Sequence, residues 1–468
     1  MVTVTPLSNP HARNIWWIAL VTQVLVGFTN GLYVYMWGPY LYERLGGATK
    51  PEIAMFLTTI LLGIRQGMVA LLEVPTGALA DAIGRAQTVV MSWVARAIFF
   101  SALTALWVCH STSLSFTCAV IASLAFAISY TMFNGAFSSW CVEMLRERAP
   151  EVSYSWLVSR FHSYQMMGVC VGGALSVVLY VNHLAYAAFL LAAVLSFIAM
   201  GFAMTKMEEV TSLRFVSTEE APIAAITKRM GEIIGRGAQV CIRKPVLFWI
   251  VLTFGAYMFL LNVVAYLWPV YLKERFGLEN SFARNWILII VAAQGLSFVG
   301  ARLLVWINGF WSRRGGVATH LAGFRRLYVG ICLLSAVSIL LLSWDTAYHQ
   351  FGGVFFPVAV LVVTFAYGII APCFETLINA YIPLENAQER ATIMSAGSMF
   401  RSFMILILAV PAGGSSGATS PIGWSIPATL LLVAALTANV LMRRAERVTV
   451  APTIQTVTPP DNEDLESE

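Results

Sequence analysis

Long apolar stretches recur along the whole chain, and they constrain its fold more than any other feature. Many of them exceed the roughly 18 residues at which an apolar run becomes a candidate membrane-spanning helix. Of the 468 residues, 58% are hydrophobic and only 11% are charged, whereas about a quarter of the residues in soluble domains carry charge. Transmembrane β-barrels show alternating segments of ~10 residues, a pattern that does not recur here. We therefore predict an all-α polytopic membrane protein.

The apolar runs define twelve predicted transmembrane helices. We place these helices at residues 15–43, 53–79, 87–109, 112–143, 154–181, 183–205, 246–275, 283–311, 326–344, 354–381, 391–410 and 424–443. A long polar stretch follows the sixth helix, and the chain ends on acidic residues, a composition that favours disorder. We expect an N-terminal six-helix bundle over 1–205, a cytoplasmic linker over 206–245, a C-terminal six-helix bundle over 246–445 and a disordered acidic tail over 446–468.

A seven-residue sequence motif occurs twice in the chain. YLYERLG at residues 40–46 returns as YLKERFG at residues 271–277, with five of the seven positions identical. The same offset in the sequence pairs Gly84 with Gly315. Parallel internal repeats of six helices, related by an axis along the membrane normal, are known in transporters. We therefore predict two six-helix pseudo-repeat halves, the alternative being a chance likeness between two interfacial anchors.

The Lys and Arg residues are unevenly distributed over the predicted loops. With a cytoplasmic N-terminus, 19 of the 29 fall on the cytoplasmic side, 5 on the outer side and 5 within helices. Cytoplasmic loops of membrane proteins are enriched in Lys and Arg. We therefore expect both termini to be cytoplasmic.

Several classes of function find no support in the sequence. There is no GxxxxGK[ST] motif, so ATP-driven pumping is not expected. The net charge of +5 is modest and gives no reason to expect nucleic-acid binding. The seven cysteines lie in or beside apolar runs without CxxC spacing, and we interpret them as packing residues. No metal-ligand or nucleophile pattern is present, so we expect no cofactor, no metal and no enzymatic activity.

The segment EVPTGALADAIGRA at residues 73–86 lies between the second and third predicted helices. It resembles the G-x-L-a-D-r-x-G-r-[KR] loop of the major facilitator superfamily through Gly77, Leu79, Asp81, Gly84 and Arg85. The Glu-Val-Pro-Thr-Gly that opens it resembles a bacterial branch of that superfamily. Glycines permit a tight turn, and Asp81 beside a helix end, with Arg85 nearby, can form a charge-assisted gating latch. The alternative is a plain polar turn.

This resemblance implies a secondary transporter that works by alternating access, in which helices 1, 4, 7 and 10 line a central cavity. It also implies a multi-pass protein of the bacterial plasma membrane, which we expect to act as a monomer on a small-molecule substrate, with protons as coupling ion. Ser312 stands at the position of Asp81 in the second-half loop, so only the N-terminal loop is expected to form the acidic latch. Two further departures weaken a standard multidrug-antiporter assignment: the fourth helix has no Arg, and GVCVGG at 168–173 is only a fragment of the antiporter pattern.

Polar residues inside apolar helices are costly and therefore informative. Arg65 and Arg401 lie near mid-membrane, whereas Arg96, Arg160 and Arg302 are shallower and can snorkel towards the cytoplasmic face, so we interpret them as interfacial anchors or interhelix pairs. We expect substrate binding by Asn30, Tyr33, Trp37, Arg65, Asn134, Gln165, Asn262, Tyr266 and Asn379, and ion coupling by Glu375 and Glu73. Helix–helix hydrogen bonding is an equally good reading of the amides. The predicted function is proton-coupled export of an amphipathic solute, against uptake, uncoupled facilitation, or a transport-inactive sensor or scaffold.

Overall fold

The computed structural model describes residues 9–34, 36–47, 49–149, 154–209, 239, 243–276, 282–314, 317–343, 345–381, 399, 402–403 and 421–450. Every regular element in this part of the chain is an α-helix. Ten of these helices are long and apolar enough to cross a membrane, and a shorter apolar segment spans Ala292–Ile307. The predicted all-α membrane architecture is confirmed, while the predicted helix at 391–410 lies almost wholly outside the described residues.

The described helices divide between the two halves of the chain. The N-terminal half comprises α1 (Pro10–Val34), α2 (Trp37–Arg44), α3 (Pro51–Ile83), α4 (Arg85–Ala105), α5 (Thr112–Arg148), α6 (Tyr154–Val181) and α7 (Ala185–Lys206). The C-terminal half comprises α9 (Pro245–Phe276), α10 (Phe282–Arg314), α11 (Val317–Ser343), α12 (Asp345–Tyr381) and α14 (Pro421–Val450).

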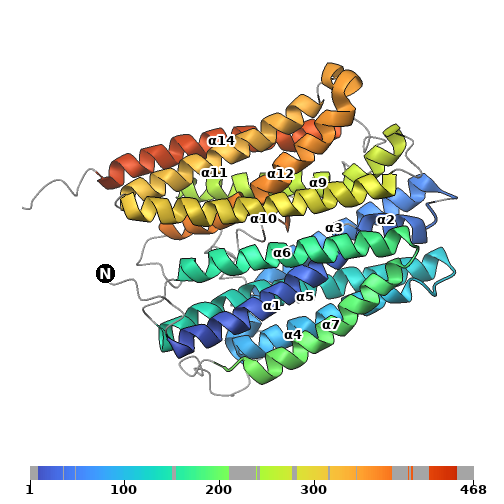
Figure 1. Ribbon diagram of the computed structural model, residues 1–468, viewed down its shortest axis with the longest axis horizontal. Coiled ribbons are helices and arrows are strands. Elements are labelled where there is room, and N and C mark those ends of the chain that lie inside the picture. The colour runs from blue at the N-terminus through green and yellow to red at the C-terminus, as the bar shows by residue number, and fades with distance from the viewer. Residues whose placement is uncertain are drawn as a thin grey trace, which may run out of the picture.

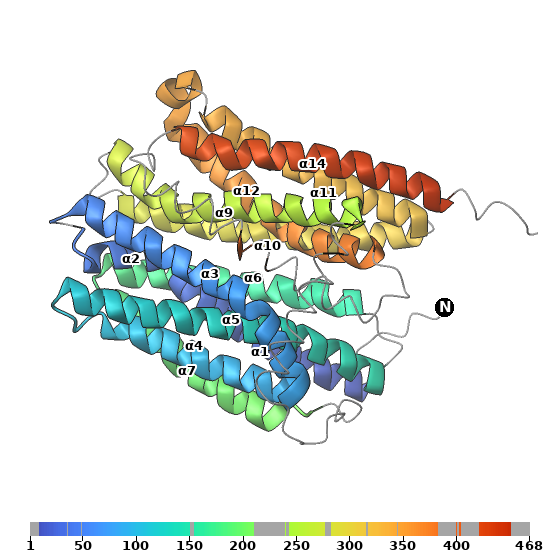
Figure 2. The same cartoon turned by 180° about the vertical axis from the view of Figure 1, so that it is seen from behind.

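The two halves form two stacked bundles whose helices run along the long axis of the molecule (Figures 1 and 2). The start of α1 and the end of α14 lie at the same end of the molecule, and α2 lies at the opposite end (Figure 1). The two helices that carry the repeated heptapeptide, α2 and α9, contact each other. The halves also meet along α6, which packs against α10 and α12.

Several helix boundaries differ from the predicted ones. The first predicted helix, 15–43, is two helices, because Pro39 lacks an N–H and its ring clashes with the carbonyl four residues earlier, at the break between α1 and α2. The second continues to Ile83 instead of ending at 79, and the ninth begins at Val317 instead of 326. In the last two, polar residues extend a helix beyond its apolar run.

Glycines bring α1 and α6 into backbone contact. A Cβ atom added at Gly27 would overlap the backbone carbonyl oxygen of Gln165, and one added at Gly172 would overlap that of Phe28. Gly31 and Gly168 face the opposite helix in the same way. Each helix therefore presents two glycines four residues apart, the spacing that lets membrane helices approach closely without a large hydrophobic driving force.

The outer surface of the bundle carries large apolar side chains. Leu71, Trp306 and Met204 are 69%, 68% and 65% exposed in the isolated chain. Groups of this size on a helical surface indicate contact with an apolar phase. A lipid bilayer provides this apolar phase, in agreement with the length and hydropathy of the helices.

Candidate functional site

Three of the predicted binding residues meet in the core of the N-terminal half. The guanidinium carbon Cζ of Arg65 on α3 lies 4.6 Å from the ring centroid of Trp37 and 4.9 Å from that of Phe126 on α5. Tyr33 on α1 packs edge-on against Phe126, with 5.4 Å between ring centroids. Arg65 and Trp37 are each 1% exposed. A guanidinium over desolvated aromatic faces gains cation–π attraction, so this cluster holds a positive charge inside an apolar bundle.

Arg96 on α4 is a second buried cation, with an exposure of 5%. Its Nη1 donates to Thr29 Oγ1 at 3.0 Å and to Asn30 Oδ1 at 3.1 Å, and its Nε donates to Ser129 Oγ at 3.4 Å. All three acceptors are neutral, and Arg96 contacts no carboxylate among the described side chains. Of the two roles expected of Arg96, the structure supports the interhelix contact and not snorkelling, because α1 and α5 supply acceptors within the bundle.

The other predicted binding residues do not join this cluster. Asn134 is exposed on α5, and Asn262 Nδ2 donates to the carbonyl oxygen of Met258 on its own helix at 2.6 Å. Gln165 is half-buried on α6, where its backbone carbonyl faces Gly27. The side chains of three further predicted residues lie outside the described part of the chain: Tyr266, Asn379 and the proposed proton carrier Glu375.

Glu73 is the other predicted coupling residue, and it is 8% exposed on α3. It follows Arg65 by eight residues on the same helix, which corresponds to about 12 Å along the helix axis. The two side chains therefore lie on one face but at different depths. Among the described residues, no group of three or more His, Cys, Asp or Glu side chains could hold a metal ion.

The predicted gating loop is mostly helical. α3 continues through Gly77, where an added Cβ would meet nothing within 4 Å, so this glycine provides neither a turn nor a close contact. The chain turns at Gly84 alone, which adopts φ +104° between α3 and α4. Only glycine adopts this conformation readily. The side chain of Asp81 lies outside the described residues, so its predicted role as a latch stays a prediction.

Two glutamates, Glu143 on α5 and Glu209 beyond α7, bind Arg85 and the backbone next to the turn at Gly84. The guanidinium of Arg85 forms an ion pair with Glu143 of α5. The carboxylate of Glu209, three residues beyond α7, accepts from the backbone N–H of Arg85 at 2.7 Å and from that of Ala86 at 3.0 Å. A helix N-terminus has unsatisfied N–H groups and a partial positive charge. Glu209 therefore caps α4 from outside that helix.

The neighbouring Glu208 ties the same region to α5. Its backbone carbonyl accepts from Trp140 Nε1 at 2.8 Å, and its carboxylate pairs with Arg148 Nη2 at 2.6 Å. We call the contacts of Glu208 and Glu209 the N-terminal clasp. This clasp joins the segment after α7 to the start of α4 and to the C-terminal part of α5. It lies at the end of the molecule where α1 begins and α14 ends.

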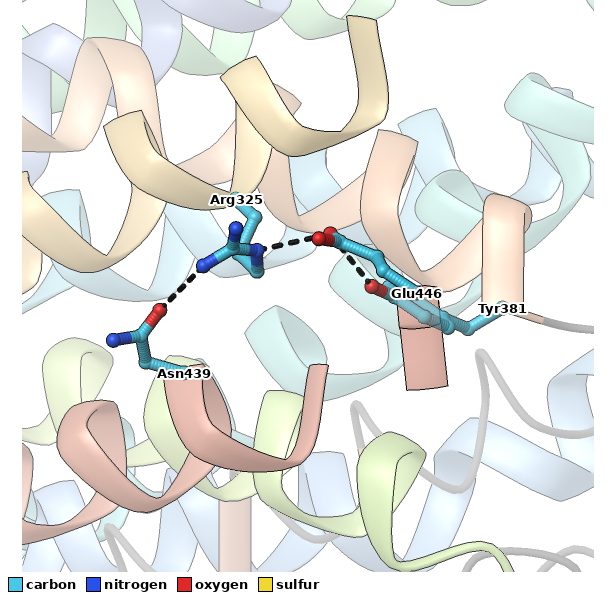
Figure 3. A network of polar contacts seen from close by, with 4 residues as sticks. All are labelled: Arg325, Tyr381, Asn439 and Glu446. Atoms are coloured by element: carbon cyan, nitrogen blue, oxygen red, sulfur yellow. Dashed lines mark hydrogen bonds and ion pairs between the residues drawn. The ribbon is translucent and has the colours of Figure 1, made fainter. Parts of the chain in front are cut away.

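The C-terminal half has a corresponding clasp, formed by Glu446 on α14 (Figure 3). Arg325 on α11 is 4% exposed, and it donates from Nε to Glu446 Oε1 at 2.9 Å and from Nη1 to Asn439 Oδ1 at 2.7 Å. The hydroxyl of Tyr381, at the end of α12, lies 3.3 Å from the same carboxylate oxygen. Burial and the Glu446 carboxylate raise the pKa of Tyr381, so the hydroxyl stays protonated and donates.

The two clasps use the same helices of each half. In the N-terminal half, Glu209 beyond α7 binds the start of α4 and its neighbour Glu208 binds α5. In the C-terminal half, Glu446 on α14 binds both Arg325 of α11 and Tyr381 of α12. Composition alone does not distinguish Glu208, Glu209 or Glu446 from the other acids, because all three lie in polar segments that read as solvated. A usable signal was their shared position at the ends of α7 and α14.

Replacing Glu209 by alanine is expected to destabilise the start of α4 by about 1 kcal/mol, because two N–H groups lose their acceptor. Hydrogen exchange should become faster at residues 85–88, and the melting temperature in detergent should fall. Glu208→Ala is the matched control. Its side chain is 63% exposed in its ion pair, and exposed pairs contribute about 0–1 kcal/mol. Equal protection of 85–88 in Glu209→Ala and in the parent would contradict the capping role.

Comparison with known proteins identifies the family to which the sequence is similar. The family model of the Major Facilitator Superfamily matches residues 19–409. No match was found among curated proteins.

Several solved structures are similar over almost the whole chain. The D-xylose–proton symporter aligns with a TM-score of 0.66 and 14% identity, over 92% of this chain and 97% of that one. The peptide transporter POT aligns with a TM-score of 0.67 and 13% identity, over 92% and 95%. A human organic anion transporter aligns with a TM-score of 0.59 and 16% identity, over 92% and 99%. At these identities the likeness concerns the fold. Together with the family match over most of the chain, it shows that this protein belongs to the Major Facilitator Superfamily of membrane transporters.

Proposed function

We propose that this protein is a proton-coupled secondary transporter that exports a small amphipathic organic compound bearing an acidic group. Its two halves would rock around a central site, so that the site opens to one side of the membrane at a time. The proposal includes a plasma-membrane location with both termini in the cytoplasm.

The positive charge inside the N-terminal half is the observation that carries the anionic preference. Arg96 is buried among three neutral oxygens, and Arg65 is buried against two aromatic rings. A charged arginine at the membrane centre costs at least ~2.5 kcal/mol, and an anionic solute nearby would offset this cost for Arg96, whose acceptors are neutral. The aromatic rings beside Arg65 supply apolar surface for the rest of such a solute.

Direct transport measurements test the proposal. Purified protein in liposomes should accumulate carboxyfluorescein against its gradient when a pH gradient is imposed, whereas protein-free liposomes should not. The cationic dye ethidium tests the opposite charge preference. Movement of carboxyfluorescein that ignores the pH gradient would favour uncoupled facilitation, and movement of neither dye would favour a sensor or scaffold.

Replacing Glu375 by glutamine is expected to abolish uphill transport while leaving downhill exchange of the solute intact. A carboxyl on a cavity-lining helix can carry a proton through the cycle, and an amide cannot. The measurement is accumulation under a pH gradient against exchange without one.

Glu73→Gln is the comparison variant, because Glu73 is the other acid proposed to couple transport to protons. Loss of uphill transport in Glu73→Gln alone would move the proton site to α3. Uphill transport that persists in both single variants and in the double variant would contradict proton coupling through these carboxyls.

A further inference from the structure

Two cysteines lie in contact where α4 turns into α5. The Sγ atoms of Cys109 and Cys118 are 3.8 Å apart, and both side chains are half-buried. Cys109 follows the last turn of α4, and Cys118 lies in the second turn of α5. A disulfide has an S–S distance of about 2.05 Å and needs Cβ atoms about 3.5–4.5 Å apart. Thiols already in contact reach that geometry by small side-chain rotations.

The pair lies at the end of the molecule opposite the termini. Trp107, two residues before Cys109, packs against Tyr186 with ring centroids 4.5 Å apart, and Arg44 of α2 lies over the Trp107 ring at 4.6 Å. Aromatic rings beside a cation are typical of the membrane–water interface. α5 has 37 residues, about 55 Å of helix against a hydrocarbon core of ~30 Å, so its first turns can protrude towards water.

We propose that Cys109 and Cys118 form a disulfide on the outer face of the membrane, and that this bond links the end of α4 covalently to the start of α5. The proposal does not depend on the transported solute, but it does depend on the termini being cytoplasmic. In that orientation the pair faces the compartment in which disulfides form and persist.

The reaction is thiol–disulfide exchange with an external disulfide oxidant. The Cys109 thiolate attacks one sulfur of the oxidant, which gives a mixed disulfide and releases one thiolate. The Cys118 thiolate then attacks the Cys109 sulfur, forms the intramolecular bond and releases the second thiolate. The two protons of the cysteines pass to the two released thiolates, so the protein loses two electrons and the oxidant is reduced to two thiols.

The bond would act inside one half of the protein. α4 and α5 pack against each other within the N-terminal bundle. Among the described residues, the main contacts between halves are made by α2, α6, α9, α10 and α12. A cross-link between α4 and α5 therefore restrains the unfolded chain without bridging the two moving parts. It should raise thermal stability.

Thiol trapping tests the proposal in cells and in purified protein. Cells are quenched with acid, free thiols are blocked with a maleimide, and the protein is reduced and labelled with a second, heavier maleimide. No Lys or Arg lies between Arg96 and Arg146, so chymotryptic cleavage after Leu114 or Phe116 separates the two cysteines. We expect the second label at both Cys109 and Cys118. In a sample digested without reduction, we expect a disulfide-linked peptide about 2 Da lighter than the two thiol peptides combined.

Purified parent protein that is first reduced and then incubated with oxidised glutathione should fall from seven free thiols, the number of cysteines in the chain, to two fewer. Its melting temperature should rise and return on reduction. Cys109→Ser should show neither change, whereas Cys170→Ser, which removes another half-buried cysteine, should behave like the parent. Full first-label alkylation of Cys109 and Cys118, both in cells and after glutathione treatment, would overturn the proposal.

Discussion

Replacing Gly172 by alanine is expected to destabilise the N-terminal half by about 1–3 kcal/mol or more, as overpacking does in close-packed interiors. The added methyl would overlap the backbone carbonyl of Phe28. A backbone atom cannot rotate away as a side chain can, so α1 and α6 would have to separate along their length. Gly27→Ala should have a similar effect, because its methyl would overlap the carbonyl of Gln165. Melting temperature in detergent and the yield of folded protein measure both.

Two other helical glycines provide the control. A Cβ added at Gly135 or Gly201 would meet nothing within 4 Å. Alanine is favoured over glycine in a helix by up to about 1 kcal/mol, so Gly135→Ala and Gly201→Ala should leave stability equal or slightly higher. If Gly172→Ala melted at the same temperature as Gly201→Ala, the close packing of α1 on α6 would not be a determinant of stability.

Replacing Arg65 by alanine is expected to weaken binding of an anionic solute about 10- to 100-fold, since hydrogen bonds to a charged group contribute ~1.5–3 kcal/mol. Arg65→Lys keeps the charge but loses the planar fork that pairs with a carboxylate and stacks on Trp37 and Phe126. Its affinity should therefore lie between those of the parent and Arg65→Ala. The measurement is a binding titration with carboxyfluorescein on purified protein.

The interpretation requires that each variant is folded, because Arg65 is buried. A melting curve for each variant provides this control. If both variants bind carboxyfluorescein as tightly as the parent, Arg65 has only a structural role in its aromatic cluster. If instead the affinity for ethidium rises when Arg65 is removed, the central site prefers cations and Arg65 excludes them.

The fold class could be predicted from the sequence because the bilayer imposes it. A backbone in hydrocarbon must satisfy its own hydrogen bonds, so each apolar run of sufficient length becomes a helix. The glycine pairs Gly27/Gly31 and Gly168/Gly172 were also visible as a spacing, although only GVCVGG was noted. Helix ends were predicted less well, since polar residues continue α3 and α11 beyond the apolar runs.

Part of the candidate site was also accessible from the sequence. At 100° per residue, Tyr33 and Trp37 fall on one face of the predicted helix 15–43, and the depth of Arg65 singled it out. That Arg65 contacts Trp37 and Phe126, and that Tyr33 packs against the same Phe126, depends on how α1, α2, α3 and α5 pack. Arg96 shows the same limit, because its acceptors Thr29 and Ser129 lie on other helices.

The sequence alone was sufficient for the class of protein and for most of the helical spans, because these depend on local composition and on the membrane. Only the tertiary structure shows that Glu209 caps α4 and that Glu446 binds Arg325. These contacts join residues more than a hundred positions apart, and many acids in the polar segments could have supplied the carboxylate. The packing of the helices decides which acid makes each contact. Glu209, for example, must reach the unsatisfied N–H groups at the start of α4, and their position depends on how α4 packs against its neighbouring helices.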